Sequence, residues 1–301
     1  MAVAPGRRER QCLWRLLEMA RDEDLGSGDV TSAILPQQVH AMGRFVARAP
    51  LVFCGGALLE AVAMCYDGGI RTVTKAGEGE RVDAGAVLAV WDGPCRGIMS
   101  AERVALNFLQ RLSGVATTTR QYVDAVAGTG AAIYDTRKTT PGWRDLEKYA
   151  VRVGGGQNHR MGLYDAVLIK DNHLSVLARA EGQDPLAAAG RELQRLRPYL
   201  GDRAFVELEV ETLEQFEVAL TLPVDIILLD NMSVERLRQA VEMRKAAGLA
   251  GRVVLEASGG IDLRNVRAVA DAGVERIAVG ALTHSPGAVD IALDIELDRV
   301  A

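Results

Sequence analysis

The feature that most limits the fold of this chain is a series of six short apolar runs in its second half. The runs occupy residues 131–135, 165–171, 204–210, 224–230, 252–260 and 276–282. Amphipathic stretches with helical spacing separate most of them, at about 174–200, 212–221, 233–247 and 262–272. Strands buried on both faces have continuous apolar sequences, and helical crossovers join parallel strands. The pattern therefore predicts a parallel α/β sheet, either closed into a barrel or doubly wound.

Neither of the nucleotide-binding loops that are usual in open sheets is present. No GxGxxG follows a predicted strand, and no GxxxxGK[ST] occurs.

The first 112 residues have a different sequence pattern, which predicts an α+β fold. Its expected helices are 12–20, 57–66 and 100–114, and its expected strands are 43–53, 70–74 and 86–91. We expect Ser100 to cap the third helix and Gly114 to end it.

Composition excludes several classes of protein. The 35 basic and 40 acidic residues give a net charge of −5, and 49% of residues are hydrophobic, which excludes a disordered chain and argues against a nucleic-acid binder. The four cysteines form no CxxC pair, so we expect buried free thiols rather than a zinc site. No secretory signal and no apolar run of membrane-spanning length is found, so we expect a cytoplasmic protein without a membrane partner.

Nearly every predicted strand ends in a polar or charged residue. In an α/β barrel, the carboxyl ends of the strands form the active-site face. A charge at one strand end often marks only entry into solvent, but five in succession favour a functional site. The residues in these positions are Asp135, Lys170, Asp171, Asp230, Glu256 and Ser258, with Glu207 and Glu209 on one face of a single strand.

The charges divide by sign along the chain. Cations come first, at Arg137, Lys138, Arg144, Lys148, Arg152, His159, Arg160 and Lys170, and carboxylates follow, at Glu207, Glu209 and Asp230. Arginine matches carboxylates and phosphates, while carboxylates can hold Mg²⁺ together with substrate phosphates. The pattern indicates a metal-chelated polyanion beside a second anion. Surface salt bridging is the alternative, and it is our interpretation for the helically spaced Arg144, Asp145, Glu147 and Lys148.

Two glycine loops follow the last two predicted strands. The first is Ser258–Gly259–Gly260, and the second is Gly280–Ala281. Backbone N–H groups beside a helix start bind anions, and the last two loops of a barrel are a common phosphate site. The pair therefore predicts a sugar-phosphate site, although each loop alone also fits an ordinary strand-to-helix turn. The glycines at 154–156 more simply permit a tight backbone path.

The block DTRKTTPGWRDLEKYAVRVGGGQNHRMGLYDAVLIKDNH at 135–173 closely resembles quinolinate phosphoribosyltransferase, also called carboxylating nicotinate-nucleotide pyrophosphorylase. The resemblance extends in order through residues 23–32, 100–117, 206–215, 228–233, 256–261 and 279–285. It implies that quinolinate reacts with 5-phosphoribosyl 1-pyrophosphate to give nicotinate mononucleotide, pyrophosphate and CO₂, in de novo NAD synthesis. A phosphoribosyltransferase of the same fold acting on another aromatic acid is the alternative.

The resemblance also implies an architecture and an assembly. It implies an N-terminal α+β sandwich-like domain over 1–112 and an incompletely closed α/β barrel, like type II phosphoribosyltransferases, over 113–285. The tail 286–301 is expected to pack back towards the first domain. The implied assembly is a homodimer with shared active sites, and a hexamer stays open.

Roles follow residue by residue from the same resemblance. The quinolinate-binding residues are Arg103 from the partner subunit, Arg137, His159, Arg160 and Lys170. The residues for the phosphoribosyl donor are Thr136, Lys138, Glu209, Asp230, Ser258, Gly259, Gly260, Val279, Gly280 and Ala281. Glu209 and Asp230 hold Mg²⁺, directly or through water, and the catalytic set is Lys138, Lys170, Glu209 and Asp230.

Some alternatives stay open at this point. His159 could order the 154–156 glycine loop instead of binding quinolinate, and the proton that reaches C2 of the product could come from Lys170 or water. A barrel isomerase or aldolase would use Lys170 to form a Schiff base. A regulatory phosphate-binding module without turnover is a further alternative. However, so many converging charges would destabilise the fold, which argues that they have a function.

Overall fold

The structure is a computed structural model that describes residues 4–181, 184–201 and 204–297. The chain divides into two compact units, neither of which is one continuous stretch. The first comprises Met1–Arg120, Lys138–Gly156 and Ala281–Ala301, and the second comprises Gln121–Arg137 and Gln157–Gly280. The last residues of the predicted tail, 298–301, and residues 182–183 of the predicted 174–200 helical stretch lie outside the described residues.

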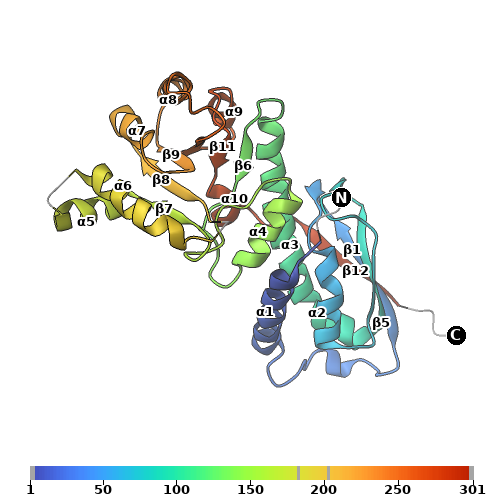
Figure 1. Cartoon of the computed structure of the whole chain (residues 1–301). Coiled ribbons are helices and arrows are strands. Elements are labelled where there is room, and N and C mark those ends of the chain that lie inside the picture. The colour runs from blue at the N-terminus through green and yellow to red at the C-terminus, as the bar shows by residue number, and fades with distance from the viewer. Residues whose placement is uncertain (1–3, 182–183, 202–203, 298–301) are drawn as a thin grey trace. The chain divides into compact units, whose positions relative to one another are not determined.

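The first unit is an α+β structure around an antiparallel sheet. Its strands are β1 (His40–Ala47), β2 (Leu51–Val52), β3 (Arg71–Thr74), β4 (Arg81–Val82), β5 (Val87–Pro94) and β12 (Ile291–Leu297). Its helices are α1 (Arg7–Leu25), η1 (Ser32–Ile34), η2 (Gly56–Leu58), α2 (Leu59–Tyr66), α3 (Cys95–Ala125, whose last residues belong to the second unit), α4 (Arg144–Val153) and α10 (Ala281–His284). The main sheet has the order β12-β1-β5-β3, and helices α1, α2 and α3 lie on one side of it (Figure 1).

The core of the first unit consists of aliphatic and aromatic residues from the sheet and from these helices. Phe45 of β1 contacts Trp91 of β5 edge-to-face, with ring centroids 4.8 Å apart, and both side chains are fully buried. The antiparallel pairing of β12 with β1 places residues 291–297 in this unit. Three of the four cysteines are buried as predicted, and Cys65 is half-buried; all four are free thiols.

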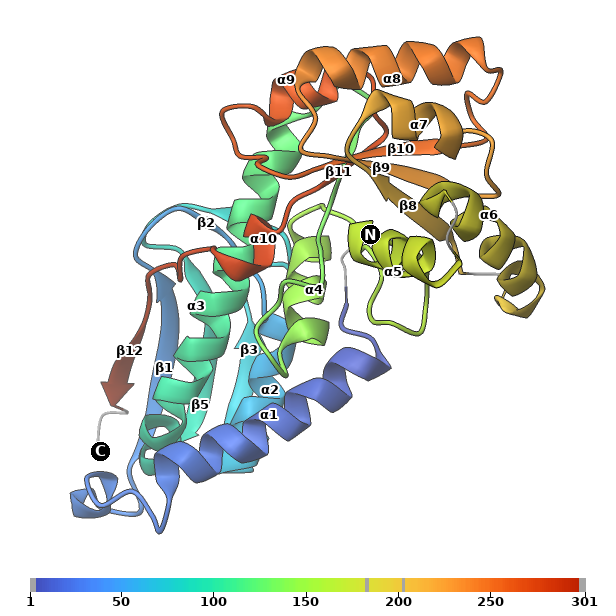
Figure 2. The same cartoon turned by 90° about the vertical axis from the view of Figure 1, so that its left-hand side faces the viewer.

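The second unit is built from alternating strands and helices. Its strands are β6 (Ala132–Tyr134), β7 (Val167–Ile169), β8 (Val206–Val210), β9 (Ile226–Asp230), β10 (Val254–Ser258) and β11 (Arg276–Ala278). Its helices are α5 (Asp171–Glu181), α6 (Pro185–Leu196), η3 (Arg197–Tyr199), α7 (Leu213–Ala219), α8 (Val234–Ala246) and α9 (Val266–Ala270). Each strand falls inside one of the six apolar runs, and α7 and α8 run along one side of the sheet in both views (Figures 1 and 2).

All pairings in this sheet are parallel, in the order β6-β11-β10-β9-β8-β7. Among the described residues, the edge strands β6 and β7 do not pair with each other, so the structure is barrel-like but not closed. This confirms the predicted fold class of an α+β part with an incompletely closed α/β barrel. Because the strands are parallel, their carboxyl ends meet at one edge of the sheet.

Two local predictions were wrong. Helix α3 begins before Ser100 and continues through Gly114, so neither residue is a terminus. A Cβ atom at Gly114 would lie 2.2 Å from the backbone oxygen of Gly287, which explains why glycine occurs inside the helix.

The surface interpretation of the 144–148 charges also fails for Glu147 and Lys148, which are fully buried, whereas the partly exposed Asp145 does pair with Arg8, at 3.4 Å. Both Oε atoms of Glu147 accept hydrogen bonds: Oε1 from Arg111 at 2.6 Å and from the Thr140 hydroxyl at 2.8 Å, and Oε2 from the Thr140 N–H at 3.0 Å. Arg111 also donates to the carbonyls of Thr283 and Pro286. Helical spacing showed which residues share a face but not that this face is buried.

Among the described residues, no helix is both long and apolar enough to cross a membrane.

Candidate active site

The end of β6 and the loop at 157–160 are joined through one buried carboxylate. Asp135 directly follows β6 and is fully buried. Its Oδ1 accepts a hydrogen bond from the backbone N–H of His159 at 2.8 Å, and its Oδ2 accepts one from the Asn158 side chain at 2.6 Å. The N–H of Asp135 donates to the carbonyl of Gln157. These bonds bring the two arginine-bearing segments of the sequence motif, 136–137 and 159–160, side by side.

Arg137 and Arg160 are consequently electrostatic neighbours, and both are half-buried. Burial and the adjacent Arg137 charge lower the pKa of Arg160, while Glu207 and Asp165 act in the opposite direction. Arg160 also donates to the carbonyl of Ala166, just before β7. Two guanidinium groups beside each other in a partly desolvated place repel, and a bound anion would relieve that repulsion.

The strand ends of β7, β8 and β9 carry a second group of charges. Lys170, directly after β7, forms an ion pair and hydrogen bond with Oε2 of Glu209 on β8. Burial raises the pKa of Glu209; the Lys170 contact lowers it, and the nearby carboxylates of Asp230 and Asp171 raise it further. The Asn231 side chain donates to Oδ2 of Asp230 at 2.6 Å. A cation and two neighbouring carboxylates therefore share the same edge of the sheet.

The predicted phosphate loops follow the adjacent strands β10 and β11. Gly259 and Gly260 both have positive φ, at 90° and 59°. A Cβ atom at Gly259 would lie 2.2 Å from Oδ1 of Asn231, so the close approach of the β9 and β10 loops requires glycine there. Ser258 pairs with Asp230 in the parallel register, and Val279 donates from its N–H to the carbonyl of Tyr134. Thr136 and Gly280 also lie in the second unit.

Three of the predicted residues belong to the first unit: Arg103, Lys138 and Ala281. The carbonyl of Lys138 accepts a hydrogen bond from the hydroxyl of Thr283 at 2.8 Å. Arg103 is exposed on α3 and lines a cavity of about 350 Å³ together with residues of α1 and Trp143.

The glycines at 154–156 lie against Thr119 and Ala116. A Cβ atom at Gly154 would lie 2.6 Å from the backbone oxygen of Ala116, so glycine is needed there for the close approach of the two backbones.

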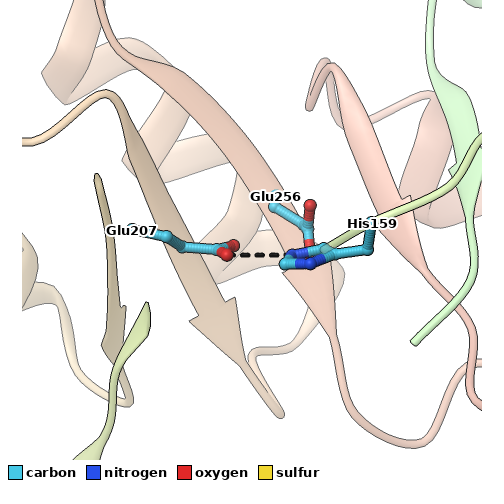
Figure 3. Close-up of side chains that lie close together, drawn as sticks. All are labelled: His159, Glu207 and Glu256. Carbon is cyan, nitrogen blue, oxygen red and sulfur yellow. Dashed lines mark ion pairs between the residues drawn. The ribbon is translucent and has the colours of Figure 1, made fainter. Parts of the chain in front are cut away.

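His159 is buried inside the second unit, with the carboxylates of Glu207 and Glu256 close to its ring (Figure 3). Its Nε2 is 2.9 Å from Oε2 of Glu207 on β8 and 3.3 Å from Oε1 of Glu256 on β10. Arg276, at the start of β11, lies beside Glu256 in the register, with its Nε 2.6 Å from Oε2 of Glu256. The guanidinium stacks on the ring of Tyr134, 3.9 Å from the centroid. His159, Glu207, Glu256 and Arg276 form what we call the buried charge group.

The other ring nitrogen of His159 is also used, because Nδ1 accepts a hydrogen bond from the backbone N–H of Arg160 at 2.7 Å. Burial lowers the pKa of His159, and the contacts with Glu207 and Glu256 raise it by more. A second proton on Nδ1 would displace the Arg160 N–H, which opposes that protonation. The bond to Arg160 therefore assigns the ring hydrogen of the neutral form to Nε2, facing the carboxylates.

Sequence reasoning missed part of this arrangement. Asp135 and Glu256 stood at predicted strand ends but received no role, and that position was the signal that could have found them. Arg276 stands at the start of its strand, so no sequence signal pointed to it. Only the parallel register places it beside Glu256.

Comparison with known proteins gives a consistent result over most of the chain. Residues 115–294 match the family described as quinolinate phosphoribosyl transferase, C-terminal domain, and residues 29–113 match its N-terminal domain. The nicotinate-nucleotide pyrophosphorylase [carboxylating] of Mycobacterium leprae is 42% identical over 283 residues, covering 93% of this chain and 95% of the relative. The probable enzyme of that name from Bacillus subtilis is 38% identical over 280 residues, covering 92% and 91%.

Solved structures agree with this match. The crystal structure of the nicotinate-nucleotide pyrophosphorylase from Ehrlichia chaffeensis superimposes with a TM-score of 0.82 at 39% identity. The alignment covers 94% of this chain and 98% of that one. The similarity therefore extends over both units.

Proposed function

Because this chain belongs to the quinolinate phosphoribosyltransferase family, we propose that the polar strand ends of its second unit form the active site of that reaction. The enzyme transfers the phosphoribosyl group of 5-phosphoribosyl 1-pyrophosphate to quinolinate with loss of CO₂, a step of NAD biosynthesis. Its small-molecule substrates are quinolinate and the phosphoribosyl donor. The roles of individual residues, the metal and the assembly are the parts that we propose.

The observation that carries the site proposal is the pair of neighbouring half-buried guanidinium groups, Arg137 and Arg160. Quinolinate has two adjacent carboxylates on a pyridine ring, and two guanidinium forks match two carboxylates. Lys170 adds a third cation at the end of β7. We assign Arg137, Arg160 and Lys170 to quinolinate, with His159 beside them and Arg103 supplied by the partner subunit.

The donor is proposed to lie towards β8–β11. We assign to it Thr136, Lys138, Glu209, Asp230, Ser258, Gly259, Gly260, Val279, Gly280 and Ala281. The nearby Asp230 carboxylate raises the pKa of Glu209, and paired carboxylate oxygens suit Mg²⁺, so these residues fit the ion. When bound, Mg²⁺ would neutralise charge on the pyrophosphate.

The proposed chemistry begins at the ring nitrogen of quinolinate, which forms a bond to C1 of the ribose. The C1–oxygen bond breaks at the same time, and its electron pair leaves with pyrophosphate. Lys138 is proposed to stabilise the charge that develops on the leaving group, which is electrostatic catalysis. The arginines hold the carboxylates and orient the ring, and orientation is worth about 7–11 kcal/mol at best.

Ribosylation makes the ring a pyridinium, which prepares the loss of CO₂. The bond from C2 to its carboxylate breaks, CO₂ leaves, and the electron pair stays on C2 beside the positive nitrogen. A proton then adds to C2 and gives nicotinate mononucleotide. Lys170 and water are the two proton sources proposed for this step.

The turnover assay tests the function directly. Quinolinate, the phosphoribosyl donor and Mg²⁺ are expected to yield nicotinate mononucleotide and pyrophosphate, followed by absorbance and by pyrophosphate release. Nicotinate in place of quinolinate is expected to give little product, since it offers one carboxylate to a site with three cations. Turnover of nicotinate but not quinolinate would identify the protein as a paralogue with a different substrate.

A homodimer with shared active sites is proposed from the exposed position of Arg103, and a hexamer is compatible with it. Arg103→Ala and Lys170→Ala protomers are each expected to be inactive. Mixing them should restore part of the activity, because hybrid dimers contain one site with both residues intact. Absence of restoration despite demonstrated subunit exchange would exclude sharing of Arg103.

We also propose a cytoplasmic location, which the four free thiols support.

A further inference from the structure

The buried charge group is not accounted for by substrate binding. Glu207 and Glu256 have no exposed surface, and the Arg276 side chain is 12% exposed, yet none of the three was assigned to a substrate. Burying a charged side chain is unfavourable unless the charge is paired. The contact of Glu207 and Glu256 with His159, the fourth member of the group, offers an explanation for their burial.

His159 links the buried charge group to the substrate side of the sheet. Its Nε2 faces Glu207 and Glu256, and its Nδ1 accepts from the N–H of Arg160. The ring of Phe205 packs edge-on against it at 5.5 Å, which limits its rotation. Both ring nitrogens are thus engaged by the chain itself, and the residue held through Nδ1 is the proposed quinolinate arginine.

A metal site is the competing interpretation of the same side chains. The ligand atoms of His159, Glu207 and Glu256 all lie within 4.8 Å of one another, and their composition suits a divalent ion. However, Arg276 already brings a positive charge to Glu256, and Nε2–H already faces both carboxylates. These ion pairs balance part of the charge of the two carboxylates without a metal ion, although none of the carboxylate oxygens has a partner in full hydrogen-bond geometry among the described residues.

We propose that His159 is a positioning residue for quinolinate: it holds the Arg160 backbone through Nδ1 and is itself held in place by Glu207 and Glu256. This inference rests on the proposed function, because Arg160 must bind quinolinate for the positioning to matter. Two substitutions distinguish the role of Nδ1 from the role of Nε2. The amide of asparagine can place an acceptor near the position of Nδ1, whereas that of glutamine reaches the position of Nε2.

The experiment compares His159→Asn with His159→Gln. His159→Asn keeps an acceptor for the Arg160 N–H, so its KM for quinolinate is expected to rise only about 3-fold. His159→Gln keeps a donor for Glu207 but loses that acceptor, and its KM for quinolinate is expected to rise about 30-fold. The KM for the phosphoribosyl donor should change less than about 3-fold in both variants, which is no more than the loss of one weak contact would cause.

An equal loss in both variants, or a smaller loss with glutamine, would overturn the proposal, because Nε2 or ring volume would then be what matters. The matched controls are His40→Asn and His40→Gln, at an exposed position of the first unit, which should leave both KM values unchanged. Failure of the wild-type protein to use quinolinate would instead defeat the proposed function. Melting curves verify that each variant is folded.

A second pair of variants applies if the His159 variants do not fold. Glu207→Gln keeps an acceptor for Nε2–H and should raise the KM for quinolinate less than about 3-fold, whereas Glu207→Leu should raise it about 10-fold. Equal KM values for the two variants would overturn the anchoring role. One equivalent of a divalent metal in purified wild-type protein, absent from Glu207→Gln, would also overturn it in favour of a metal site.

Discussion

Replacing Arg160 by alanine is expected to lower kcat/KM for quinolinate by about 100-fold or more. The substitution removes a charged fork from a half-buried place where a substrate carboxylate would otherwise be paired. Most of the loss should lie in KM, because the contact forms in the ground state as well as in the transition state. Steady-state kinetics with each substrate varied in turn measures the split.

The stability of the ligand-free Arg160→Ala protein is expected to stay the same or rise slightly, since one of two repelling guanidinium groups is gone. Arg160→Lys should lie between alanine and wild type, because it keeps the charge but loses the fork. Arg195→Ala is the matched control in the same unit: its side chain is 80% exposed and pairs with Glu192 of its own helix. A marked loss of stability with normal quinolinate affinity would show that Arg160 is structural.

The largest effect on stability is expected from Arg111→Ala in the first unit. The fully buried carboxylate of Glu147 would lose its charge partner, which typically costs about 3–5 kcal/mol. The carbonyls of Thr283 and Pro286 would lose their donor as well. Calorimetry of the whole chain should show the melting transition lowered by about 10 °C.

Arg48→Ala is the appropriate comparison for Arg111→Ala. Arg48 pairs with Asp294 in the same unit, but both side chains are about half exposed, so we expect a loss of about 1 kcal/mol or less. If both variants melt alike, the interpretation of Glu147 as a buried anchor of α4 is wrong. Because Glu147 also holds the Thr140 N–H and hydroxyl, the loop that follows Lys138 is expected to loosen with it.

Local sequence pattern predicted the fold of the second unit well. Each of the six apolar runs contains one strand of the parallel sheet, because a strand covered on both faces must be apolar along its length. The same reasoning placed Lys170 and Asp230 at strand ends, where the structure has them. Pattern failed at Gly114 and Glu147, since an approaching backbone and a distant arginine decide those positions.

The candidate site divides in the same way. The residues proposed to touch substrate lie in sequence motifs, so Arg137, Arg160 and Lys170 could be named from the chain alone. Their roles stay predictions. The residues that support them could not be found in that way, because Arg276 meets Glu256 only through strand register, and Glu207 meets His159 only through the packing of a loop into the sheet.

The sequence by itself determined the strands, their charged ends and the family, because these depend on side-chain types in a short stretch of chain. The tertiary structure alone decided which charges are buried and which partners they have. Burial and pairing depend on segments brought together from far apart, as with Arg111 and Glu147 or His159, Glu207 and Glu256. Local spacing does not contain that information, although burial and pairing decide what it costs to desolvate a charge.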